Sequence, residues 1–189
     1  MNTTVVRVNL NDVNAQFIQD LRASVGNKAQ VEIRVEDMKH GEGLFSEDQF
    51  WGIIDLLDWT KKHRSDIMTP AVMALSKLPI SNIYLFQDML SEKLFQLDTR
   101  QHVNGYLQKQ SDGNLSVDDF LYVRCAVVAE GKSYYEEILN APSDMPGEID
   151  FEHLLSLAGD AYKLKTGRDF DYLPIYNYET KSNVEGWKN

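Results

Sequence analysis

Two short segments near the start of the chain carry apolar residues at every second position. The first covers residues 6–10 and the second covers residues 31–35, with polar residues between the apolar ones. This spacing is typical of strands that bury one face. We therefore expect a β-α-β head over residues 1–36. Because two strands alone make a marginal sheet, the head must pack on the rest of the chain or offer a strand edge to a partner.

A helical pattern lies between these two segments. Its apolar positions run from Val13 to Val25, Asn11 or Asp12 can cap its start, and Gly26 fits a left-handed stop. This helix would connect the two strands of the head.

The segment 37–45 holds two glycines and several charged residues, which indicates a connector. After it, the apolar residues follow a helical spacing, and we expect one helical domain over residues 46–189.

Several helix starts in this domain are marked by capping residues. Ser46 and Ser116 each stand three residues before a Gln or Asp, which is typical of a capping box. Thr69 is followed by a proline, and proline is favoured at the first helical position. The predicted start residues are Ser46, Thr69, Ser81, Ser116 and Asp150.

The most apolar segment, residues 120–129, predicts the central helix of a bundle. Gly131 ends or bends it, and Gly167 stops the last helix. The aromatic tail over residues 169–189 is expected to run extended across the bundle, either packed into a groove or exposed as a recognition surface. The predicted fold class is α+β, mainly α: an irregular helical bundle with a small N-terminal β-α-β module and an extended aromatic C-terminal tail.

Charge narrows the range of partners. The 189 residues include 19 Lys and Arg against 29 Asp and Glu, for a net charge of −10. Such a charge repels a phosphate backbone, and the densest basic run, residues 61–64, is short. We therefore expect no nucleic-acid binding, and a basic protein partner suits the acidic surface.

The sequence also predicts a compartment. Cys125 is the single cysteine, so no internal disulfide can form, which suits a reducing cytoplasm. The first seven residues lack the basic start and apolar core of a signal peptide, and no stretch approaches ~20 consecutive apolar residues. We expect a cytoplasmic protein with no membrane segment.

Several segments resemble the bacterial family designated domain of unknown function 4240. They are the Phe-Trp pair at residues 50–51 and the stretches 119–132, 162–172 and 178–187. The resemblance extends over about residues 45–187 and leaves the head outside. It implies a mostly helical fold and carries over no catalytic residue. The chain departs from the family in lacking the glycine-rich, Trp-bearing stretch that many members have before the central helix.

The usual catalytic patterns are absent from the sequence. It has no glycine-rich phosphate loop, no nucleophile elbow, and four scattered histidines without metal-ligand spacing. Cys125 lies in an apolar helix, where burial disfavours a thiolate, so we interpret it as a core residue. We expect no cofactor and no metal, and the catalytic residues of any activity stay unknown.

Four residues stand out as candidates for binding. A guanidinium in the most apolar helix must either point out along the polar edge of the helix or pair with a carboxylate or with backbone carbonyls. Arg124 is therefore either a structural residue, in a salt bridge or a clamp on the tail, or an anion-binding residue. Asp118, Asp119 and Glu179 are its candidate partners. The candidate binding residues are Arg124, Asp119, Tyr178 and Trp187.

Three functions remain open. The lack of a catalytic pattern favours a non-catalytic acidic interaction or regulatory module, of which an immunity or antitoxin protein is one form, by analogy alone. The alternative is an enzyme with a small-molecule pocket in which Arg124, His153 or Asp119 converge. The third is a structural subunit that forms oligomers. The sequence leaves the oligomeric state undetermined.

Overall fold

A computed structural model describes Val6, Val8, residues 12–26, Ala29, Val31, residues 44–110 and residues 113–188. The chain divides into two units, Met1–His40 and Gly41–Asn189. The division falls inside the segment that the sequence indicates as a connector.

The first unit contains the helix α1, Ala15–Val25. Its N-cap is Asn14, whose side chain accepts a hydrogen bond from the Phe17 N–H at 3.0 Å. The cap is therefore neither Asp12 nor Asn11, which lies outside the described residues. Gly26 follows the helix at φ +82°, a backbone conformation that favours glycine, so the predicted stop is confirmed.

The prediction of a β-α-β head is not supported. Three of the predicted strand positions are described, namely Val6, Val8 and Val31, and none of them is in a strand. Their side chains are exposed, so the alternating pattern has no buried face here. The other positions of the two predicted strands lie outside the described residues. Over the described residues the fold is mainly helical rather than α+β.

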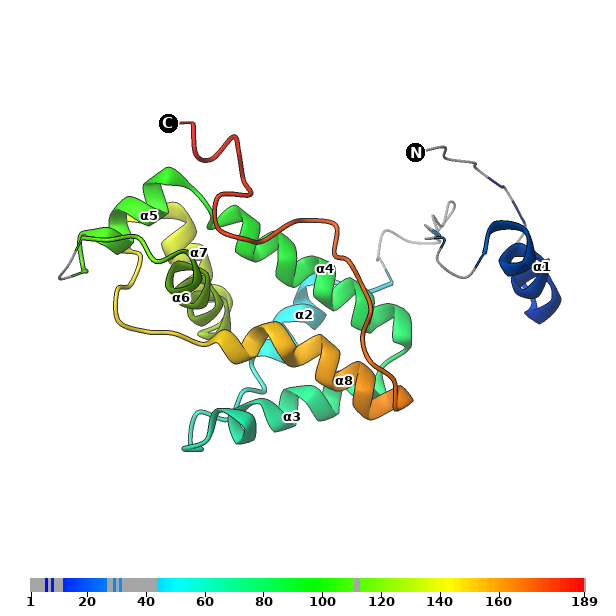
Figure 1. Cartoon of the computed structure of the whole chain (residues 1–189). Helices are drawn as coiled ribbons and strands as arrows, with labels where there is room; N and C mark the ends of the chain where they lie inside the picture. The colour runs from blue at the N-terminus through cyan, green and yellow to red at the C-terminus, as the bar shows by residue number, and fades with distance from the viewer. Residues whose placement is uncertain are drawn as a thin grey trace. The chain divides into compact units, whose positions relative to one another are not determined.

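The second unit is an irregular bundle of helices (Figure 1). Two short 3₁₀ helices, η2 and η3, lie between the last two α-helices. The elements are α2 (Glu47–Ile54), α3 (Arg64–Lys77), α4 (Ile80–Gln96), α5 (Arg100–Leu107), α6 (Val117–Ala129), α7 (Lys132–Asn140), η2 (Pro142–Asp144), η3 (Glu152–Ser156) and α8 (Leu157–Thr166).

The helix α6 is central, as its composition predicts. Every residue from Val123 to Ala129 is buried, and α6 packs against α4, α7 and η3. A second layer is formed where α3 lies along α8. Among the described residues, none of the helices is both long and apolar enough to cross a membrane.

Two of the predicted helix starts are confirmed in detail. At α2 the Ser46 hydroxyl accepts from the Gln49 N–H at 3.2 Å, while the Gln49 side chain accepts from the Ser46 N–H at 2.8 Å. At α6 the Ser116 hydroxyl accepts from the Asp119 N–H at 3.2 Å. Each cap satisfies backbone donors that the first helical turn leaves without an intrahelical partner.

The predicted starts at Thr69, Ser81 and Asp150 are wrong. Helix α3 begins before Thr69, at Arg64, and encloses the proline, because the buried positions on either side of it lie on one face. Helix α4 follows a proline N-cap directly, so Ser81 is inside it. After Asp150 the chain first forms η3 and becomes α-helical only at α8.

The last 20 described residues form the aromatic tail. It has no helix or strand and folds into turns after residue 178, so the predicted extended course holds for its first half only. Gly167 ends α8 in the left-handed conformation at φ +70°, and the tail then follows α4 in the same direction (Figure 1). Tyr172 stacks on Tyr84 near the start of α4 at 4.7 Å, and Tyr176 lies 5.1 Å from Phe95 near its end. Most of the aromatic rings of the tail therefore pack against the bundle, as expected for a tail that lies in a groove.

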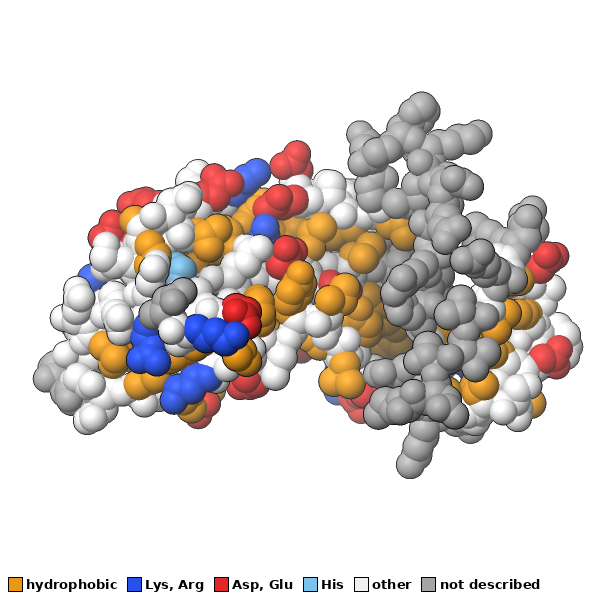
Figure 2. Space-filling model, turned by 90° about the horizontal axis from the view of Figure 1, so that it is seen from above, with side chains coloured by type: hydrophobic (Ala, Val, Ile, Leu, Met, Phe, Trp, Pro, Cys, Tyr) orange, Lys and Arg blue, Asp and Glu red, His pale blue; other side chains and the backbone are white. Residues whose placement is uncertain are grey.

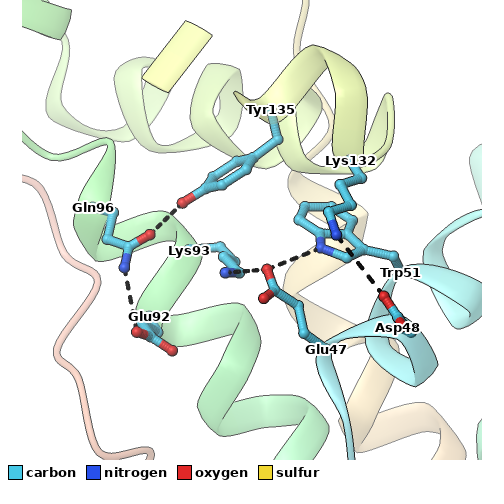
Figure 3. A network of polar contacts seen from close by, with 8 residues as sticks. All are labelled: Glu47, Asp48, Trp51, Glu92, Lys93, Gln96, Lys132 and Tyr135. Carbon is cyan, nitrogen blue, oxygen red and sulfur yellow. Dashed lines mark hydrogen bonds and ion pairs between the residues drawn. The ribbon is translucent and has the colours of Figure 1, made fainter. Parts of the chain in front are cut away.

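A polar network fixes the Phe-Trp helix α2 to α4 and α7 (Figure 3). Glu47 accepts hydrogen bonds from Lys93 at 2.6 Å and from the Trp51 indole N–H at 3.2 Å. The Lys93 ammonium also lies 5.5 Å from the centre of the Tyr135 ring. Because the polar atoms of both Trp51 and Lys93 pair with Glu47, this network links α2 to α4.

Candidate functional site

Asp98 anchors the end of the tail from inside the bundle. It follows α4 and is fully buried. Its carboxylate accepts hydrogen bonds from the backbone N–H groups of Lys181 and Asn183 at 3.1 and 3.0 Å, and from the Trp187 indole N–H at 2.9 Å. The Ser182 hydroxyl is 3.5 Å away. A buried carboxylate is tolerated only when its oxygens are satisfied, and this one is.

Arg124, in α6, is the second buried charged residue that binds the tail. It is fully buried in α6, donates to the Leu94 carbonyl at 2.8 Å and donates to the Thr180 hydroxyl at 2.9 Å. Thr180 in turn donates to the Val117 carbonyl at 2.7 Å. Burial lowers the pKa of Arg124, and the charge of Asp98 opposes that effect. Through these hydrogen bonds Arg124 joins the tail to α4 and α6, which is the clamp that the sequence analysis gave as one of its alternatives.

The carboxylate partners expected for Arg124 are wrong. Asp118, Asp119 and Glu179 form no ion pair with it among the described residues, because its guanidinium points along α4 toward a backbone carbonyl. Backbone carbonyls and a hydroxyl replace the carboxylate, which is possible because a guanidinium is a donor with many directions.

Two other candidates lie on the tail itself. Tyr178 is half-buried and packs against the core, and burial raises its pKa. Trp187 packs there as well, with its indole held by Asp98. Their role in binding stays a prediction.

Asp119, the fourth candidate, lines a cavity of about 490 Å³ beside the first half of α6. The cavity lies between the starts of α3 and α6, the end of α5, the loop 147–150 and η3. Its polar wall is formed mainly by acidic side chains. They are Asp119, Glu148, Asp150 and Glu152.

Only part of this acidic charge is neutralised within the chain. Asp150 pairs with Arg64, and this ion pair lowers the pKa of the Asp150 carboxyl. Glu152 approaches the His153 ring at 3.9 Å. Asp119 and Glu148 form no ion pair among the described residues. The cavity therefore presents an excess of negative charge.

The Tyr122 phenol is affected by this excess of negative charge. It lies in the wall of the cavity, and its pKa is raised first by burial and then by the charges of Asp118, Glu152 and Asp119. Negative groups that make a phenolate less favourable will in the same way make a bound cation more favourable.

The three residues proposed for an enzymatic pocket do not all converge. His153 and Asp119 line the acidic cavity, whereas the Arg124 guanidinium faces the tail. Cys125 is fully buried, and burial raises the pKa of its thiol to about 12, so it is held as a neutral core residue. The nucleophile interpretation finds no support in this geometry.

The sequence analysis missed two residues that build these sites. Asp98 is separated from its tail partners by more than 80 positions, and no local pattern marks it. Arg64 lies in the short basic run 61–64, and it pairs with Asp150, which is 86 positions away in the chain. One feature of the sequence could have identified Asp98. It directly follows an apolar helix, where a carboxylate needs hydrogen-bond donors.

Fold and sites define a small helical protein with a tail clamped to its core and an acidic cavity on its surface. Residues 45–164 match the model of the family described as a protein of unknown function, DUF4240. The chain belongs to this family, as the resemblance indicated. The match begins at the N′ residue of α2 and ends in α8, so it contains the acidic cavity and stops before the tail. No curated protein and no solved structure matches the chain.

Proposed function

We propose that this protein is a non-catalytic interaction module whose acidic cavity receives a basic segment of a protein partner. The observation that carries the proposal is the excess of carboxylates around one cavity, of which Asp119 and Glu148 lack an ion-pair partner among the described residues. A Lys or Arg side chain of a partner would supply the missing charge.

The other walls of the cavity support this choice. Tyr122 offers an aromatic ring, and guanidinium groups stack well on aromatic faces. Arg64 already forms an ion pair with Asp150 at the rim, so a guanidinium fits the charge pattern of this wall. The net charge of −10 would also steer a basic partner toward the surface before contact.

The proposed setting is the bacterial cytoplasm. An acidic module that neutralises a basic protein, as immunity proteins and antitoxins do, is one form of the proposal and rests on analogy.

A peptide titration tests the proposal. A labelled hexapeptide of alternating Arg and Gly is titrated into the full chain, beside a peptide with Gln in place of Arg. The triple variant Asp119→Asn, Glu148→Gln, Glu152→Gln removes the acidic wall. Exposed charge pairs contribute about 0.5 kcal/mol each, so we expect binding of the Arg peptide to weaken about tenfold.

A matched variant separates the cavity from general charge. Glu130→Gln, Glu136→Gln and Glu137→Gln also remove three negative charges, from exposed positions around α7 that do not line the cavity. This control should weaken binding less than about twofold. Equal weakening by both triple variants would show that binding depends only on net charge, and it would refute the acidic cavity as the binding site.

A further inference from the structure

A second cavity, of about 420 Å³, lies beside Trp187 and has the opposite charge. Its apolar lining comes from α5 and from the segment just before α6, and the Trp187 ring completes it. The apolar lining residues are Val103, Leu107, Leu115 and Trp187. This volume is within the range of sites that bind small molecules.

Two cations lie at this cavity, both against the same ring. The Arg100 guanidinium is 5.6 Å from the centre of the Trp187 ring, and the Lys181 ammonium is 5.8 Å from it. Neither side chain forms an ion pair with a carboxylate anywhere in the described part of the chain. These two cations concentrate positive charge at one place in a protein whose net charge is −10. Figure 2 shows Lys and Arg side chains gathered beside apolar ones on the face of the second unit that is seen from above.

The buried Asp98 carboxylate forms no ion pair with the Arg100 or Lys181 side chain. Its oxygens already accept from two backbone N–H groups, from the indole and from a hydroxyl. Its contacts instead fix the position of the Trp187 ring and of the Lys181 backbone.

The backbone at Lys181 supports a positioned cation. Its φ is +76°, and it is the one non-glycine residue in the described ranges with a positive φ. This conformation is unfavourable for lysine, and the hydrogen bond from its N–H to Asp98 holds it in place. Strained residues of this kind cluster at binding and active sites.

We propose that the cavity beside Trp187 binds a small organic anion with a flat apolar body and a carboxylate end. The ring and the aliphatic lining would take the flat body, and Arg100 and Lys181 would take the carboxylate. The site is separate from the acidic cavity and shares no lining residue with it.

Calorimetric titration of the full chain with 3-phenylpropanoate tests this proposal, beside its neutral amide and beside acetate. We expect a dissociation constant of at most about 1 mM for 3-phenylpropanoate and at least tenfold weaker binding of the amide and of acetate. The amide lacks the charge and acetate lacks the flat body, so each removes one half of the recognition.

Variants assign the binding to the two cations. Arg100→Gln removes one charge, and Lys181→Asn removes the other while keeping a residue that tolerates a positive φ. Each should weaken binding at least tenfold, whereas Lys188→Gln, which removes a cation outside the lining, should leave it unchanged. A thermal melt confirms that each variant is folded.

The proposal is overturned if the wild-type chain does not bind 3-phenylpropanoate at millimolar concentration. It is also overturned if the acid and the amide bind equally, or if both cation variants bind as the wild type does. The triple variant of the acidic cavity should retain this binding, so failure of the proposed function and failure of this inference are distinguishable.

Discussion

Two fully buried charged residues, Asp98 and Arg124, join the tail to the bundle, and they do so through different chemistry. The carboxylate of Asp98 accepts from main-chain and side-chain donors of the tail, whereas the guanidinium of Arg124 donates to a helix carbonyl and to Thr180. Neither residue neutralises the other through direct contact, so each depends on polar groups of the tail. Loss of the tail contacts would leave the Asp98 charge buried without these donors, and it would leave Arg124 with the Leu94 carbonyl alone.

Replacement of Asp98 should destabilise the whole unit. Asp98→Ala removes the acceptor for the tail's N–H groups and the Trp187 indole, so we expect a loss of about 3–5 kcal/mol in the free energy of unfolding. Chemical denaturation measures this loss. Asp171→Ala, at an exposed tail position, should change the free energy by less than about 0.5 kcal/mol. An equally small effect of Asp98→Ala would contradict the role of Asp98 as an anchor of the tail.

His102 should make stability depend on pH. It is buried in α5, and its Nε2 lies 3.2 Å from the Ile138 carbonyl, which can only accept, so Nε2 carries the proton of a neutral ring. Burial lowers its pKa from the usual value of 6.5. As the pH falls below about 6.5, the unfolded chain takes up a proton that the folded chain excludes, so stability falls.

The slope from this single group is at most about 1.4 kcal/mol per pH unit, and it should vanish above about pH 7. Urea unfolding between pH 5.5 and 7.5 measures it. His102→Gln should lower the absolute stability but flatten the profile. A variant with the same slope as the wild type would assign the dependence to other groups.

At the scale of elements, local capping chemistry was the most predictive feature of the sequence. The starts at Ser46 and Ser116 and the stop at Gly167 follow from groups within three residues of each other. The starts at Thr69 and Ser81 failed because the burial of a long apolar face outweighed the local signal. Helix α5 was not predicted, since its composition is polar and two of its four buried positions are a histidine and a glycine, which give no apolar spacing.

These outcomes predict a contrast between two serines. Ser116→Ala removes the hydroxyl that accepts from the Asp119 N–H, so we expect a loss of about 1 kcal/mol. Ser81→Ala lies at an exposed position inside α4 and should cost less than about 0.5 kcal/mol. Both values are measured by chemical denaturation at pH 7. A larger cost than this for Ser81→Ala would indicate that Ser81 does cap the helix.

At the scale of the whole molecule, the sequence could supply the charge and the mainly helical character of the fold, whereas the β-α-β head that it predicts is not supported and the sites did not follow from it. Net charge and the family resemblance follow from composition and local motifs. The acidic cavity joins residues from Arg64 to His153, and the tail clamp joins Asp98 to Trp187. Such groupings depend on how the helices pack, which a spacing pattern in one sequence does not encode. The strand pattern of the head failed for a related reason, since alternation predicts a strand only where a core can bury one face.

Long-range charge and the cavity should act on different rate constants. Both triple variants of the acidic residues lose three negative charges, so both should slow association with the Arg peptide to a similar extent at low salt. Only the cavity variant should also speed dissociation, because only it removes contacts in the complex. Stopped-flow kinetics at low and high salt separates the two effects. Faster dissociation in the α7 control would place the contacts outside the cavity.

The most direct test of the central claim is the location of the bound Arg peptide. Amide chemical shifts of the labelled full chain are recorded during the titration. We predict that the largest changes lie in residues 119–123 and 147–153, which border the acidic cavity. Changes spread evenly over acidic residues, or centred on α7, would contradict the account.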